Sequence, residues 1–296
     1  MNVFAFIEAE KAEQRNVAKA CEMLEVSRSA FYEWHQHTPS ARQLADDELG
    51  ERIQAVYDES RGTYGWPRVH RALRDAGIHV GRARVARIMR TKGLIGVCRR
   101  RWIRTTLSDP DVIAVDLLKR TFGPGTVELD RVYVGDVTYI RTWEGWLYLA
   151  TVIDLASRRV VGWAMADHMR AELVCDALRM AIDARRPAPG AMFHSDRGTQ
   201  YTSTEFTDLL ADNEMIQSLS RPRQCWDNAV AESFFASLKL ECIYRQALPT
   251  RTHARRAVFD YIEVFYNRRR LHSTLGYMTP TAYENKIRNH TAAHAA

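Results

Sequence analysis

Residues 131–166 have the sequence RVYVGDVTYIRTWEGWLYLATVIDLASRRVVGWAMA, which is rich in β-branched and aromatic residues and is broken by short turns. This composition predicts three hairpin-linked strands, at about 131–142, 146–154 and 158–166. Helical and strand patterns then alternate: helix 170–184, strand 191–195, helix 203–213, strand 216–220, and helices 228–242 and 251–268. This order predicts an α/β domain in which helices cover a mixed sheet.

Three acidic residues mark the ends of these elements. Asp136 lies inside the first strand, and Asp196 closes the short apolar run before a glycine-containing loop. Glu232 lies on the helix 228–242, whose start signal is Asp227 or Asn228. A carboxylate inside an apolar strand is costly unless it is paired or binds a metal. We therefore expect these carboxylates to be the catalytic residues and the ligands of divalent metal ions.

Four motifs that contain or follow these acids occur between about residues 115 and 283: GDVTYI, HSDRGTQYTS, DNAVAESFFASLK and YNRRRLHSTLGYMTP. Together they resemble the catalytic core of IS3-family insertion-sequence transposases, specifically the second-reading-frame product, which is related to retroviral integrases. The resemblance implies a ribonuclease-H-like fold in which the first and fourth strands are neighbours. It also implies an Asp-Asp-Glu triad at Asp136, Asp196 and Glu232, with two Mg²⁺ (or Mn²⁺) ions, that cleaves DNA and transfers strands.

Further residues near the triad are candidates for contact with DNA. Lys239 lies seven residues after Glu232, close to two helical turns, so its ammonium shares the glutamate's face. His194 either contacts phosphate or packs in the fold, and Asn228 either faces the site or caps the helix. Gln200 and Tyr201 follow the Asp196 loop and are candidates to meet the DNA end. The cluster Arg268, Arg269, Arg270 and His272 either grips target DNA or caps the preceding helix. Trp143, Trp146 and Trp163 are expected to lie in the core.

A basic block precedes the α/β domain. Between residues 61 and 104 there are thirteen basic residues and one acid, a local charge of +12 in a chain whose net charge is +6. Such a block predicts a surface that contacts the phosphates of DNA or RNA. Its candidate contacts are Arg82, Arg84, Arg87, Arg99, Arg100 and Arg101.

The N-terminal third is expected to be helical. Helices at 16–24 and 28–34, with Ser27 as the N-cap of the second, have helix-turn-helix proportions and would present Arg28 and Ser29 to a groove. A second pair of helices is predicted at 67–75 and 82–91. We therefore expected an all-α region with a helix-turn-helix module at 1–60 and a basic, similar module at 61–104, then a linker at 105–125 containing a short helix at 112–120. The catalytic core would follow at 126–285, with a disordered tail at 286–296.

Composition narrows the class of protein. No apolar run is long enough to span a membrane, the N-terminus has no secretory signal, and the five cysteines form no Cys-x-x-Cys pair. These features predict a cytoplasmic, nucleoid-associated protein without a zinc module. The expected partners are double-stranded DNA of the transposon ends and target, further copies of the chain, and the upstream-frame product. Two alternatives stay open: a catalytically silent DNA-binding regulator and a ribonuclease-H-type nuclease.

Overall fold

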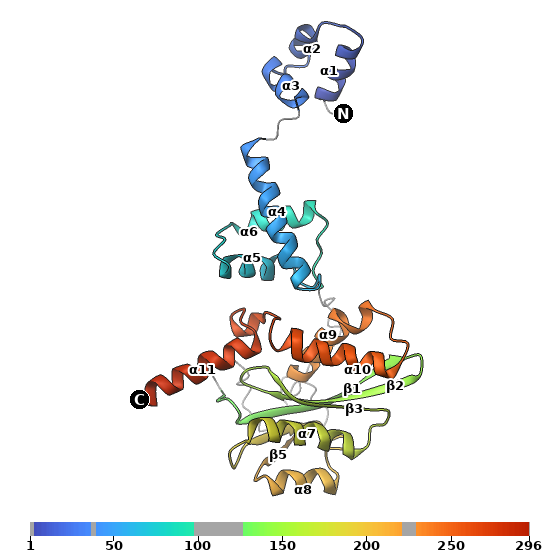
Figure 1. Ribbon diagram of the computed structural model, residues 1–296, viewed down its shortest axis with the longest axis vertical. Coiled ribbons are helices and arrows are strands. Elements are labelled where there is room, and N and C mark those ends of the chain that lie inside the picture. The colour runs from blue at the N-terminus through green and yellow to red at the C-terminus, as the bar shows by residue number, and fades with distance from the viewer. Residues whose placement is uncertain (1–2, 37–39, 98–126, 221–228, 296) are drawn as a thin grey trace, which may run out of the picture.

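The computed structural model describes residues 3–36, 40–97, 127–220 and 229–295 (Figure 1). The first three helices form a small bundle around Ile7, Cys21 and Phe31. They are α1 (Val3–Ala12), α2 (Val17–Met23) and α3 (Arg28–His35). Ser27 caps α3, since its side chain accepts a hydrogen bond from the backbone N–H of Ala30. The predicted helical pair is therefore confirmed, whereas α1 was not predicted.

The second helical module consists of α4 (Ala41–Glu59), α5 (Trp66–Asp75) and α6 (Arg82–Thr91). The apolar residues predicted to hold α5 and α6 together are buried: Val69, Leu73, Val85, Ile88 and Met89. Helix α4 packs against both of them through Leu49 and Ile53. The expected division at residue 60 therefore separates α4 from the two helices on which it packs.

Hydrogen bonds join this module to the α/β domain. The Tyr64 hydroxyl donates to the Arg269 carbonyl at 2.9 Å and accepts from the Leu271 N–H at 2.8 Å. Arg61 forms an ion pair with Asp260, which lies 199 residues further along the chain. The module and the α/β domain thus share a polar interface.

The α/β domain is built on a five-stranded sheet with the order β3-β2-β1-β4-β5. The strands are β1 (Val132–Thr142), β2 (Gly145–Asp154), β3 (Val160–Ala166), β4 (Met192–Ser195) and β5 (Ile216–Leu219). The first three are antiparallel neighbours, and β4 and β5 are added in parallel beside β1. The predicted mixed sheet and the predicted contact between the first and fourth strands are both confirmed.

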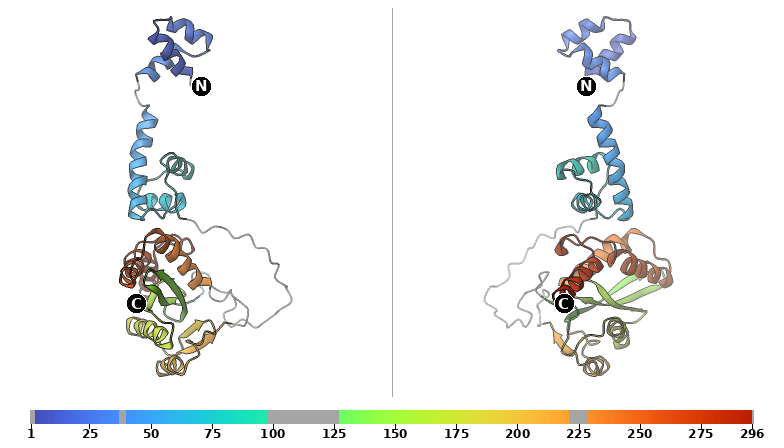
Figure 2. Two further views of the ribbon diagram at one scale, coloured as in Figure 1. Left: turned by 90° about the vertical axis from the view of Figure 1, so that its right-hand side faces the viewer. Right: turned by 60° about the vertical axis from the view of Figure 1, so that its left-hand side comes forward.

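Helices cover both faces of the sheet (Figures 1 and 2). One face carries α7 (Ala171–Arg185) and α8 (Thr204–Asp212), and the other carries α9 (Ala229–Glu241) and α10 (Arg251–Phe259). Gly135 allows a close approach inside the sheet, because a Cβ at this position would lie 2.3 Å from the Phe193 ring of β4. The Phe193 ring can therefore pack over β1 just before Asp136.

The C-terminal segment differs from the expectation in two places. The helix predicted at 251–268 is α10 followed by a π-helical stretch, η3 (Asp260–Tyr266), and two short 3₁₀ turns lie at η2 (Ile243–Arg245) and η4 (Ser273–Leu275). A disordered tail was expected at 286–296, but α11 (Pro280–Ala295) is helical there. Glu284 anchors this helix, because it is buried and accepts hydrogen bonds from Arg159 at 2.6 Å and Arg185 at 2.5 Å.

The β1–β2 hairpin corrects the expectation that its tryptophans are core residues. Trp143 is 80% exposed and Trp146 is 45% exposed, because the hairpin extends beyond the helices that cover the sheet. Trp163 is half-buried and donates its indole N–H to Glu263 at 2.9 Å. Among the described residues, no helix is both long and apolar enough to span a bilayer.

Candidate active site

The register of the sheet places two of the predicted acids side by side. Strands β1 and β4 are parallel, with Val134 opposite His194. Asp136 and Asp196 each follow two residues later, so both project from the same level and face of the sheet. The Asp196 carboxylate accepts a hydrogen bond from the Gly198 N–H at 2.9 Å, and it is exposed beyond the end of β4.

Helix α9 brings the third acid to this place. Val134 and Ile140, on the same side of β1 as Asp136, belong to the apolar cluster that also contains Phe234 and Leu238 of α9. Glu232 lies in the first turn of α9 and is exposed. Its side chain is therefore not part of the apolar face, formed by Phe234 and Leu238, that packs α9 against the sheet. The packing of α9 therefore carries Glu232 to the side of the sheet on which Asp136 lies.

Electrostatics shows that these charges interact. The pKa of Asp136 is raised to about 7, mainly because burial disfavours its charged form and further because the charges of Asp196 and Glu232 repel it. A hydrogen bond from the Val137 N–H, at 2.8 Å, and the charge of Lys239 oppose this rise. Such a strongly perturbed acid is typical of functional sites.

The donor set suits a hard divalent cation, because carboxylate oxygens are the ligands that such ions prefer. A cation would also offset the negative charge that raises the pKa of Asp136. Within the described residues, however, no three histidine, cysteine, aspartate or glutamate side chains are grouped closely enough to hold a metal ion. The structure thus gathers the acids beside the C-terminal end of β4, next to the central strand β1, without closing them into a finished metal centre.

Lys239 lies near Asp136, since the charge of each affects the pKa of the other. It follows Glu232 on α9, and its ammonium lies 5.0 Å from the centre of the Tyr139 ring. Burial lowers its pKa, while the charge of Asp136 opposes this shift. The lysine therefore supplies a positive charge next to Asp136.

Two other candidates are packed inside the fold. His194 is 3% exposed, with Nδ1 at 2.9 Å from the Ser218 hydroxyl and Nε2 at 3.2 Å from the Ser220 hydroxyl. Tyr201 is 1% exposed and packs against Phe193 and Phe206. The structure favours the packed alternative for His194, and burial removes Tyr201 from any direct contact with DNA.

Ion pairs neutralise part of the positive charge of the basic block. Asp46 of α4 lies 2.7 Å from Arg84 and 2.6 Å from Arg87. Arg61, Arg68 and Arg71 also have acidic partners. Arg82, like Arg28 and Ser29 at the start of α3, is exposed. The candidates Arg99, Arg100, Arg101 and Asn228, and the helix expected at 112–120, lie outside the described residues.

The three arginines of the YNRRRLHS motif differ in their exposure. Arg268 and Arg269 are exposed, but Arg270 is buried and donates two hydrogen bonds to Glu241 of α9, at 2.7 and 2.6 Å. Sequence reasoning missed Glu241, since an acid at the end of an amphipathic helix resembles an ordinary surface residue. It also missed Arg158, whose approach to α9 depends on the folded turn before β3.

Comparison with known proteins agrees with this architecture. A family model described as an integrase core domain matches residues 128–225, a second integrase core domain model matches residues 232–287, and an HTH-like domain model matches residues 44–102. The chain is 38% identical to the transposase InsF for insertion sequence IS3A of Escherichia coli (strain K12), over 96% of this chain and 98% of the relative. The chain belongs to the IS3 family of transposases.

A second relative agrees over a similar length. The transposase is 39% identical to an uncharacterized 31 kDa protein of insertion element IS600 from Shigella sonnei, over 90% of this chain and 97% of that protein. As a transposase with an HTH-like domain and an integrase core of ribonuclease-H-like fold, it is a polynucleotidyl transferase that binds DNA.

Among solved structures, the HTLV-2 integrase catalytic core domain in complex with magnesium matches with a TM-score of 0.39 and 16% identity, covering 52% of this chain and 95% of that chain. A simian T-cell lymphotropic virus intasome matches with a TM-score of 0.41 and 17% identity, covering 66% of this chain and 65% of that chain.

Proposed function

We propose that the transposase cuts DNA at the ends of its insertion sequence and joins them to target DNA by metal-dependent transesterification at Asp136, Asp196 and Glu232. The observation that carries this proposal is the parallel register of β1 and β4, which sets Asp136 beside Asp196. The raised pKa of Asp136, to which burial and the charges of both other acids contribute, supports it. Carboxylates are usually arranged in this way where a cationic ligand is to be held.

Asp136, Asp196 and Glu232 would hold two Mg²⁺ or Mn²⁺ ions, which when bound would activate an attacking oxygen and stabilise a leaving one. The residues of the chain have complementary tasks. Asp136 must lose its proton to act as a ligand, which its pKa of about 7 allows near neutral pH. Lys239 holds a phosphate beside the acids with its ammonium. In the joining step a 3′-hydroxyl forms a new bond to phosphorus, and the target strand's bond from phosphorus to its own 3′-oxygen breaks.

A strand-transfer assay tests this proposal. Wild-type protein, terminal DNA of the matching insertion sequence, target DNA and Mg²⁺ should give joined products, and Asp196→Asn should give none. Asp183→Asn, which removes an exposed acid of α7 on the other side of the sheet, should leave the yield unchanged. Cleavage without joining would instead indicate a nuclease, and DNA binding without either product would indicate a regulator.

DNA contact by the helical modules is part of the proposal. Arg28 and Ser29 of α3 and Arg82 of α6 are exposed and so accessible to the phosphates of DNA. Arg84 and Arg87 would have to bind DNA while sharing the charge of Asp46. Joining two transposon ends needs more than one active site, so we also propose that the protein acts as a homo-oligomer, together with the upstream-frame product.

A further inference from the structure

The turn between α4 and α5 is the part of the helical module that meets the α/β domain (Figure 1). Ser60, Thr63 and Tyr64 of this turn are buried. The Thr63 hydroxyl donates to the Ser60 carbonyl at 2.7 Å, and the Ser60 hydroxyl accepts from the Tyr64 N–H at 3.2 Å. A buried turn whose polar groups bond to one another is held in one shape, so it can act as a rigid contact.

Tyr64 makes the central contact with the domain. Its hydroxyl donates to the Arg269 carbonyl at 2.9 Å and accepts from the Leu271 N–H at 2.8 Å. Burial raises the pKa of Tyr64, so the hydroxyl keeps its proton at neutral pH and can serve both partners. A displacement of the module would leave the carbonyl and the N–H of the facing segment without their partner, which is costly for buried groups.

Charged side chains add to this contact. Arg61 forms an ion pair with Asp260 at the start of η3, and its guanidinium lies 4.9 Å from the centre of the Phe265 ring. From the domain, Arg245 of η2 donates to the Gly62 carbonyl at 3.1 Å. The turn is therefore held by η2, by η3 and by the residues that follow η3.

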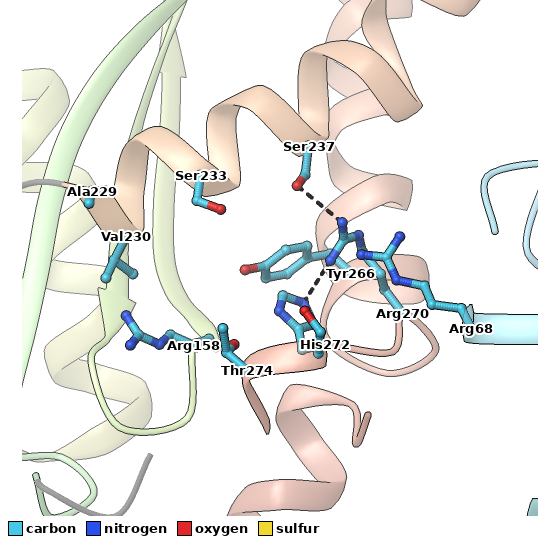
Figure 3. A pocket seen from close by; sticks show the side chains of 11 residues that line it. Arg68, Arg158, Ala229, Val230, Ser233, Ser237, Tyr266, Arg270, His272 and Thr274 are labelled. Atoms are coloured by element: carbon cyan, nitrogen blue, oxygen red, sulfur yellow. Dashed lines mark hydrogen bonds between the residues drawn. The ribbon is translucent and has the colours of Figure 1, made fainter. Parts of the chain in front are cut away.

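Helix α5 extends the contact to the helix that carries Glu232. Arg68 of α5 lies 3.8 Å from Glu241, the last residue of α9, which also pairs with Arg270 at 2.6 Å. Figure 3 shows Arg68 beside Arg270, which is hydrogen-bonded to Ser237 of α9. Glu241 lies on the same helix as Glu232, about 14 Å further along its axis. The docking contact thus joins residues 60–68 of the module to η2, η3, the segment 267–271 and α9.

We propose that this docking contact is a positioning device, which sets the distance between DNA bound by the helical module and the three acids of the candidate active site. Tyr64 and Asp260 would be positioning residues that do not themselves touch DNA. Arg82, at the exposed start of α6, is not among the docking residues, so the module can bind DNA while it is docked. The inference rests on the function proposed above. It implies that the protein acts on the phosphodiester bond at a fixed distance from the sequence that the module binds.

A double variant loosens the docking contact without changing the triad or a candidate DNA contact. Tyr64→Phe keeps the buried ring and removes both hydrogen bonds of the hydroxyl, and Asp260→Asn removes the charge of the ion pair. The matched control is Tyr57→Phe with Asp183→Asn. The Tyr57 hydroxyl donates to the Ile95 carbonyl at 2.8 Å, inside the module, and Asp183 is an exposed acid of α7. Circular dichroism and the melting temperature should show that both full-length proteins fold.

The first measurement is the yield of joined products from two terminal duplexes. One has the natural spacing, and the other has two additional base pairs, roughly 7 Å, between its end and the internal sequence that the protein protects in a footprint. In the wild type the insertion should lower the yield on the order of 100-fold, because small misplacements of a reacting group are costly. In the docking variant this ratio should fall to about tenfold or less, whereas the control should keep the wild-type ratio. A loss of stability alone would lower both yields equally and leave the ratio unchanged.

The second measurement is hydrogen exchange of the segments 60–65 and 265–271 in the absence of DNA. Both segments should be protected in the wild type and in the control, and they should exchange about tenfold faster in the docking variant. This measurement does not depend on strand transfer, so it separates a failed contact from a failed transposase function.

Three results would overturn the inference in different ways. Unprotected segments in the wild type would mean that the docking contact does not exist in solution. Faster exchange in the docking variant with an unchanged ratio between the duplexes would mean that the module is docked but does not position DNA. A wild type that is protected but joins neither duplex would refute the function proposed above, and the positioning role with it.

Discussion

The two sides of α9 carry opposite charges. Toward β1 and β4 lies the acidic side, where the pKa of Asp136 is raised to about 7 by burial and by the two other acids. Toward the segment after η3 lies the basic side, where burial and three arginines lower the pKa of His272. In each case burial moves the pKa of the group away from its usual range, and charges of one sign around the group add to the shift.

The difference between the sides lies in how the charge is compensated. On the acidic side, Lys239 is the one cation whose charge lowers the pKa of Asp136 among the interactions of the described residues. On the basic side, Glu241 is held by two hydrogen bonds from Arg270 and one from the Tyr261 hydroxyl at 2.9 Å. On the acidic side the charges of the acids repel one another, whereas the basic side contains a structural ion pair between Glu241 and Arg270.

The largest expected effect comes from removing the charge of Asp136. Asp136→Asn should reduce strand transfer by about 10⁴-fold, roughly 5.5 kcal/mol in activation free energy. The same variant should be more stable than the wild type at pH 8 without metal. The folded-state pKa, about 7, lies above the usual 3.8, so the wild type loses stability as pH rises through about 7.

The stability gain of Asp136→Asn at pH 8 is expected to be on the order of 1–3 kcal/mol and to vanish near pH 4. Urea denaturation at both pH values measures it, with Asp183→Asn as the control for an exposed acid. If Asp136→Asn is no more stable than the wild type at pH 8, then Asp136 is not held in a repulsive environment.

The next effect concerns the structural pair on the basic side. Glu241→Gln leaves the buried Arg270 without its charged partner, which should cost about 3 kcal/mol of unfolding free energy. The double variant Glu241→Gln with Arg270→Met should recover part of this loss, because it removes both charges. Urea denaturation of the four proteins gives the coupling energy, and strictly additive losses would contradict a paired arrangement.

Much of this arrangement could be predicted from the sequence, because its elements follow local patterns. The alternation of apolar residues in β1 and the helical spacing of Phe234 and Leu238 fixed the elements that carry Asp136 and Glu232. The neighbourhood of the first and fourth strands came from the family resemblance, and the sheet order confirms it.

What the sequence could not give depends on contacts between distant segments. Arg158 and Arg270 were two of many arginines, and the turn and the π-helical stretch that bring them to α9 have no local signal. Glu284 fixes α11 through Arg159 and Arg185, which lie more than 90 residues away. Because these long-range contacts leave no local pattern in the sequence, the tail at 286–296 was predicted to be disordered.

A smaller effect is expected from Lys239 on the acidic side. Lys239→Gln should lower strand transfer about tenfold, roughly 1.4 kcal/mol, because a phosphate beside the acids loses one charge-assisted contact. If the lysine binds the phosphate equally in the ground state and the transition state, KM for DNA rises while kcat is unchanged. Steady-state kinetics at varied DNA concentration decides this, with Lys286→Gln on α11 as the control.

The smallest effect is expected at the tip of the β1–β2 hairpin, at the edge of the acidic side. Trp143 is 80% exposed, so Trp143→Ala should change the unfolding free energy by no more than ~0.5 kcal/mol. Trp146 is different, since its ring lies 5.1 Å from the Tyr139 ring that Lys239 approaches. Trp146→Leu should therefore reduce strand transfer about twofold by loosening Lys239, and it should have no further effect in a Lys239→Gln background. An equal loss in both backgrounds would show that the hairpin acts on DNA directly and not through the lysine.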